Sequence, residues 1–274
     1  MTSLTAVGRR EAVRRTVPAG VRRALISAAW IVAGLGGVAA VWSTIVAAGV
    51  FPRALFPSVP DIVTAGRDLW DEGLLVGDLS SSLQRAAAGF VLGGATGLMI
   101  AVATATTTLG RNLLQPVLRV LSPIPTIGLI PLVILWFGLG ETSKILVISV
   151  GVFVPVWINA HAGIVSTPRE YLLAARCLGA SRVHTLRRVI LPEAAPDIIA
   201  GLRVGAAMAF VLIVVAEMTG TTAGLGYRIS QAQLFSQADR LIVCLLILGV
   251  IGAVCDIVIA AASAPLTRWS IQER

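Results

Sequence analysis

Charged residues are scarce in this chain. They make up 13% of its 274 residues, whereas typical soluble domains contain about 25%. Hydrophobic residues make up 56%, and the mean hydropathy is +0.87. A single soluble core of this size cannot hide so much apolar surface, so the composition excludes an ordinary soluble domain and indicates that lipid covers the remainder.

The side-chain groupings that enzymes and metal sites need are also missing. The three cysteines, Cys177, Cys244 and Cys255, form neither a disulfide framework nor a metal-ligand spacing. No Ser/His/Asp, Cys/His or paired-carboxylate arrangement predicts catalysis. His161 has no partner carboxylate in view, which favours a packed or hydrogen-bonded residue over a proton relay. We therefore propose no catalytic or metal-binding residue, and a membrane-embedded enzyme is only a weak alternative.

What the chain has instead is long apolar runs. A hydrocarbon core of about 30 Å needs roughly 20 helical residues at about 1.5 Å each. Backbone groups in lipid must bond within their own segment, and these runs lack the period-two alternation of barrel strands. We predict an all-α integral membrane protein with about six transmembrane helices, over residues 25–50, 86–110, 120–140, 145–168, 204–226 and 241–266.

The basic residues are unevenly distributed. The formal net charge is +8 and the sequence pI is about 10.9. Most of the 22 basic residues fall in the tail 1–24, the turn near Arg111, the loop 166–203 and the C-terminus. This positive-inside pattern predicts cytoplasmic termini for an even number of spans, and it explains the charge without nucleic acid. We expect a basic cytoplasmic tail over residues 1–24, with contact to anionic lipid as the alternative role, and a transmembrane domain over residues 25–274.

Glycine and proline predict how two of the spans are built. Gly89, Gly93 and Gly97 recur every four residues, which lets a neighbouring helix approach one face of the second span. Upstream, the segment 51–85 should contain a short interfacial helix.

The third predicted span should be bent or broken. In and just before this span, within sixteen residues, the chain has Pro116, Pro123, Pro125 and Pro131, which cannot all fit a regular hydrogen-bonded helix. Irregular backbone at membrane depth is tolerated where it lines a water-filled cavity, so this span is a candidate wall of a transport path. Prolines that only shape helix packing are the equal alternative.

The longest predicted cytoplasmic segment, residues 166–197, reads as two short helices. Thr167 as a cap, Pro168 at the first helical position and Glu170 three residues after the cap predict the start of the first helix. Gly179 is the residue type that ends a helix in the left-handed conformation.

The second helix of this loop should run over residues 182–191. Ser181 is its predicted cap, and Pro192 should close it. Such a compact helix–Gly–helix element fits a groove on another protein. An amphipathic element that lies on phospholipid headgroups is the alternative, and composition alone does not separate the two.

The spacing of this loop resembles the inner-loop motif of permease subunits of bacterial ATP-binding-cassette (ABC) importers. That motif is Glu-Ala-Ala, three residues, Gly, nine residues and Ile-x-Leu-Pro. The chain has Leu173-Ala174-Ala175, then Gly179, then Val189-Ile190-Leu191-Pro192 at these spacings, with Leu173 in place of Glu and Val189 in place of Ile. The resemblance implies that an ATPase contacts Glu170, Tyr171, Leu172, Ala174, Ala175, Gly179, Ala180, Ser181 and Pro192.

From about Phe56 onward, the chain resembles one branch of these permeases, the nitrate, sulfonate and taurine type. The blocks that carry it include Phe56-Pro57-Ser58-Val59-Pro60, Ser82-Leu83-Gln84-Arg85, Pro123-Ile124-Pro125, Trp136-Phe137-Gly138, Leu202-Arg203, Ala216-Glu217-Met218, Gly224-Leu225-Gly226, Asp256 and Trp269.

Such a permease is a multi-pass protein of the cell's inner membrane. The resemblance implies that it pairs with a second copy of itself and two cytoplasmic ATPase subunits, and that an external substrate-binding protein feeds it. The chain has no Gly-x-x-x-x-Gly-Lys-Ser/Thr loop, so ATP and Mg²⁺ belong to the partner ATPase and this chain binds no cofactor. The branch implies a small anion as substrate, such as a sulfonate, taurine, nitrate or bicarbonate.

Intramembrane charge is costly and therefore marks candidate functional positions. For Glu217 and Asp256 we favour a structural or gating role near opposite helix ends, with water or an Arg partner. The candidate path residues are Pro125, Pro131, Trp136, Trp157, Asn159, Met208 and Glu217. An ion-coupled secondary transporter that works without an ATPase is the alternative; it predicts an acid or His near mid-depth and an internal repeat, and neither is clear here.

Overall fold

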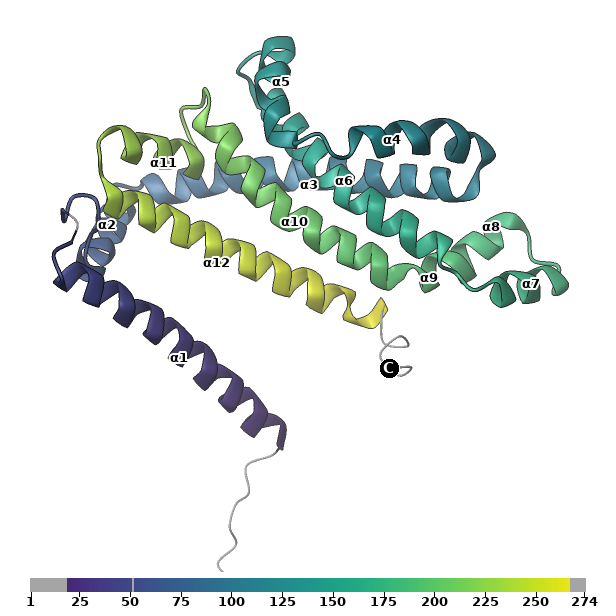
Figure 1. The fold of residues 1–274 in the computed structure, drawn as a ribbon, viewed down its shortest axis with the longest axis horizontal. Helices are drawn as coiled ribbons and strands as arrows, with labels where there is room; N and C mark the ends of the chain where they lie inside the picture. Colours follow the sequence, from purple (N-terminus) through teal and green to yellow (C-terminus); the bar gives the residue numbers. More distant parts are fainter. Residues whose placement is uncertain (1–18, 51, 267–274) are drawn as a thin grey trace, which may run out of the picture. The chain divides into compact units, whose positions relative to one another are not determined.

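The computed structural model describes residues 19–50 and 52–266. Within these residues every regular element is a helix and no strand occurs, which confirms the predicted all-α class. The chain divides into two compact units, Met1–Arg53 and Ala54–Arg274. Helix α1 (Ala19–Ala47) is the helix of the first unit, and all other elements belong to the second (Figure 1).

The second unit begins with the short helix expected in the segment 51–85. This is α2 (Val59–Asp71), and Ser58 caps it: Asp61 N donates to Ser58 Oγ (3.4 Å), while Ser58 N donates to the Asp61 carboxylate (2.9 Å). The elements that follow are α3 (Leu74–Thr106), a π-helical turn (Gly110–Leu114), α4 (Gln115–Leu121), a 3-10 turn (Thr126–Leu129), α5 (Ile130–Phe137), α6 (Glu141–Val165), α7 (Arg169–Cys177), α8 (Arg182–Thr185), a second π-helical turn (Leu186–Ile190), α9 (Leu191–Glu193), α10 (Ala195–Met218), α11 (Leu225–Leu234), α12 (Ala238–Ser263) and a final 3-10 turn (Ala264–Leu266).

Four helices of the second unit, α3, α6, α10 and α12, are long and apolar enough to cross a membrane. The bent pair Gly110–Leu121 and Thr126–Phe137 adds a fifth crossing if it forms one span. The predicted first span falls on α1, whose described apolar part is Val32–Ala47. The count of six spans and the cytoplasmic position of both termini therefore stay predictions.

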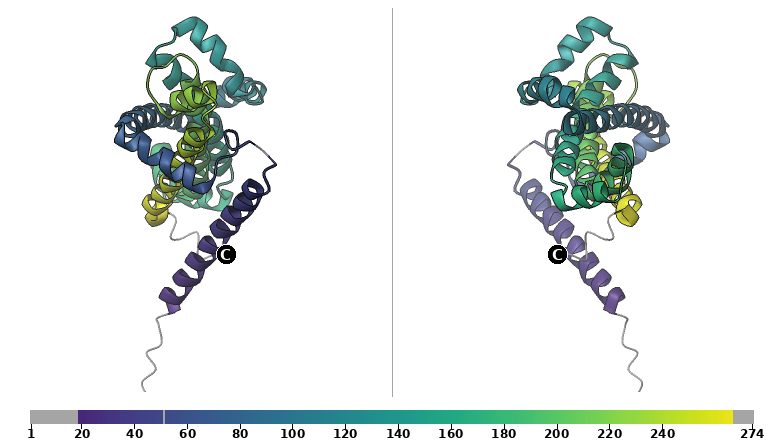
Figure 2. Two further views of the ribbon diagram at one scale, coloured as in Figure 1. Left: turned by 90° about the vertical axis from the view of Figure 1, so that its left-hand side faces the viewer. Right: turned by 90° about the vertical axis from the view of Figure 1, so that its right-hand side faces the viewer.

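The core of the second unit is a layer of three helices. α6 packs between α3 and α10, and α11 and α12 pack against α10 (Figures 1 and 2). Side chains that interdigitate in this layer, among them Val152 and Val156 of α6 and Leu212 of α10, are almost fully buried. The inner apolar faces of the three helices thus bury one another, and their outer faces remain available to lipid or to partner proteins.

Glycines bring α3 into direct contact with α6. A Cβ at Gly93 would lie 2.8 Å from Val152 Cβ, and one at Gly97 would lie 3.0 Å from the Phe153 carbonyl oxygen. Gly89 is equally crowded. These separations leave no room for a side chain, so the helices approach this closely because the three positions are glycine. The predicted packing role of the glycine face is confirmed.

The third predicted span is broken, as its prolines predict. Its halves, the π-helical turn with α4 and the 3-10 turn with α5, meet at 90°. Pro123 and Pro125 lie in the bend, and Pro131 lies in the first turn of α5. Pro116 lies inside the first half, directly after the π-helical turn, whose wider backbone makes room for the proline ring. The prolines therefore position the break without disrupting either half. Both halves stand on one side of the three-helix layer (Figure 2).

Candidate functional site

The inner loop, residues 166–197, folds into α7 and a second helical segment that runs through α8, the second π-helical turn and α9. The chain leaves α7 at Gly179, whose φ is +74°, and Ala180 N donates to Ala175 O (3.0 Å) across the helix end. Ser181 Oγ accepts a hydrogen bond from His184 N (3.3 Å) and caps α8. The predicted helix-ending role of Gly179 and the capping role of Ser181 are confirmed.

Two other predictions for the inner loop are wrong. Thr167 does not cap α7, because its Oγ1 donates to Ile164 O (3.0 Å) in the preceding turn of α6. Pro168 holds the capping position without a side-chain bond, so Glu170 completes no capping box. Pro192 does not close the second helix but lies inside it. The π-helical turn before Pro192 widens the backbone and so makes room for the proline ring.

α7, the turn after it and α8 present largely exposed apolar side chains. Leu178 is 87% exposed, Leu173 and Val183 are more than half exposed, and Tyr171 is 46% exposed. Isolated exposed apolar residues are ordinary, but four within one short loop are typical of an interaction surface. The other predicted contact residues lie around them: Glu170, Ala174, Gly179 and Ser181 are exposed, Leu172, Ala180 and Pro192 are half-buried, and Ala175 is buried.

A hydrogen-bonded cluster lies just before this loop, near the end of α6. His161 Nδ1 is 2.9 Å from Thr104 Oγ1 of α3, and His161 Nε2 is 3.0 Å from Gln115 Nε2 of α4. Trp157 Nε1 also donates to Thr104 Oγ1 (3.2 Å). Because the Gln115 amide donates to Nε2, the network assigns the proton of a neutral His161 to Nδ1. As predicted, His161 is hydrogen-bonded, and it joins α6 to α3 and to the broken span.

A buried charge cluster lies at the opposite end of the helices. α3 contributes Asp78, Ser82 and Arg85, which share one face of the helix. Arg85 donates through Nη1 to Glu217 Oε1 of α10 (2.7 Å) and through Nη2 to Glu141 Oε1 of α6 (2.8 Å). Glu217 is 1% exposed and also accepts from Ser82 Oγ (2.7 Å). One guanidinium thus ties together the three helices of the core.

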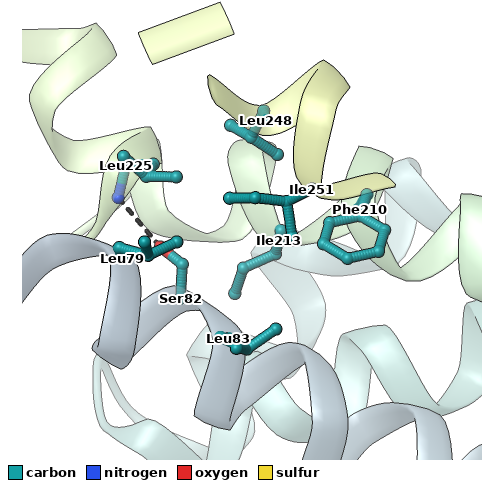
Figure 3. Close-up of a pocket in the computed structure, with 8 residues that line it drawn as sticks. All are labelled: Leu79, Ser82, Leu83, Phe210, Ile213, Leu225, Leu248 and Ile251. Atoms are coloured by element: carbon teal, nitrogen blue, oxygen red, sulfur yellow. Dashed lines mark hydrogen bonds between the residues drawn. The ribbon is translucent and has the colours of Figure 1, made fainter. Parts of the chain in front are cut away.

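The same cluster holds the start of α11. Three backbone N–H groups donate to its oxygens at 2.8, 2.8 and 2.9 Å: Gly224 to Asp78, Leu225 to Ser82 and Gly226 to Glu217. Figure 3 shows the Ser82–Leu225 bond beside a small apolar pocket between α3, α10 and α12. Among the described residues no buried side-chain polar atom lacks a hydrogen bond, so the cluster is fully satisfied.

Sequence reasoning singled out Glu217 but missed Asp78 and Arg85. The available signal was the spacing of Asp78, Ser82 and Arg85, which places three polar side chains on one face of an otherwise apolar helix. It did not identify their partners, because Glu141 and Glu217 are far away in the sequence.

The second intramembrane carboxylate has an Arg partner, one of the two alternatives that the sequence predicted. Arg203 of α10 donates through Nε and Nη2 to the two oxygens of Asp256 of α12, each at 2.7 Å. Both side chains are 46% exposed. The pair therefore links α10 to α12 at a surface rather than inside the core.

The predicted path residues do not share one environment. Pro125, Pro131, Trp136 and Met208 are exposed, whereas Asn159 is half-buried and donates through Nδ2 to Pro155 O (2.8 Å). Trp157 and Glu217 are 3% and 1% exposed and lie inside the packed helices. For these two, contact with a transported molecule would require α6 and α10 to separate from their neighbours.

No group of three or more His, Cys, Asp or Glu side chains in the described part of the chain is arranged to hold a metal ion.

The family described as "Binding-protein-dependent transport system inner membrane component" matches residues 93–267. The putative aliphatic sulfonates transport permease protein SsuC of Bacillus subtilis (strain 168) is 36% identical over 232 residues, which cover 85% of this chain and 84% of the relative. The taurine transport system permease protein TauC of Escherichia coli (strain K12) is 33% identical over 208 residues, 76% of each chain.

A solved structure of similar fold belongs to the MetNI methionine ABC transporter in an inward-facing conformation. The matched chain has a TM-score of 0.54 at 20% sequence identity, with 70% of this chain and 94% of that chain covered. The sequence match over most of the chain and this shared helical fold agree. The chain thus belongs to the inner membrane components of binding-protein-dependent transport systems, the permease subunits of ABC importers, and is a multi-pass membrane protein.

Proposed function

We propose that this chain forms the translocation path of an ATP-driven importer for a small anion. It works as a pair of identical copies, with two cytoplasmic ATP-binding subunits that hold ATP and Mg²⁺ and an external substrate-binding protein that delivers the anion. Membership in the permease family supports the transport role. In this arrangement the inner loop faces the cytoplasm and α11 faces outward.

The observation that carries the proposal is the exposed apolar surface of the inner loop. Leu178, Tyr171 and Leu173 project from a short helix whose far end Gly179 fixes. Apolar side chains that stay in water gain no free energy from their fixed positions, whereas burial in a groove of an ATPase is favourable. The alternative, an amphipathic loop that lies on phospholipid headgroups, would also bury these apolar side chains, in lipid rather than in a protein groove. The co-purification described below separates the two.

A movement of the inner loop can be transmitted through packed helices to the broken span, the proposed wall of the translocation path. Only residues 166–168 separate α6 from α7, so a displacement of α7 moves the end of α6 that carries His161. His161 bonds to Gln115 at the start of α4, in the first half of the broken span. Closure of the ATPases would therefore act on α7, α6 and α4 in turn, as a shift of packed helices.

The substrate class rests on the relatives and on charge. Two relatives are named for aliphatic sulfonates and for taurine. An unpaired carboxylate on the path would repel such anions, but Glu217 is paired with Arg85 and Asp256 with Arg203. A sulfonate, taurine, nitrate or bicarbonate ion would therefore meet no uncompensated negative charge from these two residues.

Co-purification tests this proposal with a matched pair of variants. Leu178→Glu places a charge on the exposed surface of the inner loop, and Leu234→Glu makes the same change at an exposed position on α11. We expect the tagged wild type and Leu234→Glu to bring down an ATPase from native membranes, and Leu178→Glu to recover at least tenfold less, because burying an unpaired charge is unfavourable. Recovery of no ATPase by the wild type, even after cross-linking, would overturn the proposed function.

A further inference from the structure

A polar cavity of about 250 Å³ lies between α11 and the start of α12. α11 is at the opposite end of the second unit from α7 (Figure 1). The side chains that line the cavity and carry the argument are Tyr227, Arg228, Gln231, Phe235, Gln237 and Arg240. The transport role proposed above does not use this cavity.

The end of α11 explains how these side chains converge. Tyr227, Arg228 and Gln231 lie on adjacent positions of the helix surface. Ser236 then adopts φ +54°, and Gln237 N donates to Ala232 O (2.8 Å), which is the hydrogen bonding of a left-handed helix end. The chain reverses there, and the first turn of α12 faces α11 across the cavity.

Two acidic residues that do not line the cavity hold its arginines in place. Asp78 accepts from Arg228 Nε (2.8 Å) and pairs with Arg228 Nη2 (2.7 Å), and Glu72 accepts from Arg240 Nη2 (2.8 Å). The Arg228 guanidinium also lies 5.7 Å from the centre of the Tyr227 ring. Fixed guanidinium groups of this kind recognise anions without first losing rotamer freedom.

Several donors of the cavity remain unused. Among the described residues, Arg228 Nη1 and Arg240 Nε have no hydrogen-bond partner, and neither has the side-chain amide of Gln231 or Gln237. No carboxylate of the described residues lines the cavity. A cation would face two guanidinium groups, and an apolar molecule would leave these donors unpaired, so the complementary ligand is an oxyanion.

We propose that this cavity binds the carboxylate or sulfonate group of an anion that approaches from the α11 end. The proposal rests on the proposed function, which places that end outside the cell and names a small anion as cargo. The cavity is slightly smaller than typical small-molecule sites of about 300–1,000 Å³, so it holds one compact anionic group. That group belongs either to a free small anion or to an acidic side chain of an external protein, and the two sources are separable by experiment.

The first test adds a negative charge inside the cavity without changing side-chain size. Gln231→Glu does this, and Gln233→Glu makes the same change at an exposed position of α11 that does not line the cavity. Binding of ethanesulfonate and acetate to the full chain in lipid nanodiscs is measured by titration calorimetry. We expect Gln231→Glu to raise the Kd about tenfold and Gln233→Glu to change it less than twofold. Equal binding by both variants and the wild type would overturn the proposal.

The second arm applies if the wild type binds neither free anion. The external binding protein is then titrated against the assembled transporter, and stimulation of ATP hydrolysis is measured. A concentration for half-maximal stimulation that rises about tenfold in Gln231→Glu, but not in Gln233→Glu, assigns the oxyanion to the binding protein. If the two variants differ neither in Kd for the free anions nor in the concentration for half-maximal stimulation, the proposal is wrong.

The two proposals fail in distinguishable ways. A chain that recovers an ATPase through the inner loop, yet shows no specific effect of Gln231→Glu, disproves the cavity proposal alone. A chain that binds ethanesulfonate in the cavity, yet recovers no ATPase, disproves the proposed function alone. Thermal unfolding of both variants checks that neither substitution disturbs the fold, as expected for side chains that are not buried.

Discussion

Arg85 of α3 donates through Nη1 to Glu217 of α10 at 2.7 Å, and the same guanidinium also bonds Glu141 at the start of α6. The Glu217 carboxylate is fully buried, whereas the bidentate Arg203–Asp256 pair is half exposed. The two intramembrane ion pairs should therefore differ in what they contribute. Burial makes the first pair a structural joint, because a lone partner would remain charged without solvent.

Removal of the buried carboxylate should destabilise the protein strongly. Glu217→Ala leaves Ser82 Oγ and the Gly226 N–H without this acceptor and removes one of the two carboxylates that Arg85 bonds. We expect a loss of about 3–5 kcal/mol in the free energy of unfolding, measured as the shift of the unfolding midpoint in detergent. Asp256→Ala is the matched control and should shift the midpoint much less. Equal shifts for the two variants would show that the buried Arg85–Glu217 contact does not stabilise the protein more than the exposed Arg203–Asp256 pair.

Helix contact at the glycine face predicts opposite effects for two identical substitutions. Gly93→Ala pushes a Cβ against Val152 and should destabilise the protein by about 1–3 kcal/mol. Gly249→Ala on α12 meets no atom within 4 Å. It should stabilise the protein by about 0.5–1 kcal/mol, because alanine favours the helix. Thermal unfolding of the two variants distinguishes close packing from a general intolerance of larger residues, which would destabilise both.

The bond between His161 and Gln115 should matter for transport more than for assembly. Gln115→Leu removes the donor to His161 Nε2 and leaves α7 unchanged. We expect ATPase recovery at the wild-type level and anion uptake about tenfold lower, the effect of about 1.4 kcal/mol. Ser149→Ala, which removes only a local bond to Ile145 O within α6, serves as the control. Uptake at the wild-type level in Gln115→Leu would disprove this route from α7 to the broken span.

Local rules predicted the features that depend on neighbouring residues. The prolines predicted the break of the third span, the glycine spacing predicted the close approach of α3 and α6, and Gly179 and Ser181 predicted the helix ends of the inner loop. Each of these follows from the backbone preference of a single residue type or from helical periodicity. Such preferences act over one or two turns and are readable in the sequence.

Competing bonds and distant partners set the limit of prediction. The Thr167 hydroxyl can either accept a hydrogen bond from the backbone of α7, as a cap, or donate one to the preceding turn of α6. It donates to Ile164 O and therefore does not cap α7. Arg85 and Glu217 meet only because α3 and α10 pack side by side. A composition rule that penalises intramembrane charge marks Glu217, but it does not say which cation neutralises it. Only the packed structure supplies that pairing.

In the proposed function, ATP rather than an ion gradient drives anion uptake through this chain. The most direct test measures uptake of labelled taurine and ethanesulfonate by cells that carry the complete transporter, while a protonophore collapses the ion gradient and ATP is held constant. We expect uptake to persist under the protonophore and to stop when ATP is depleted. Uptake that stops when the gradient collapses, with ATP intact, would contradict the account and favour an ion-coupled transporter.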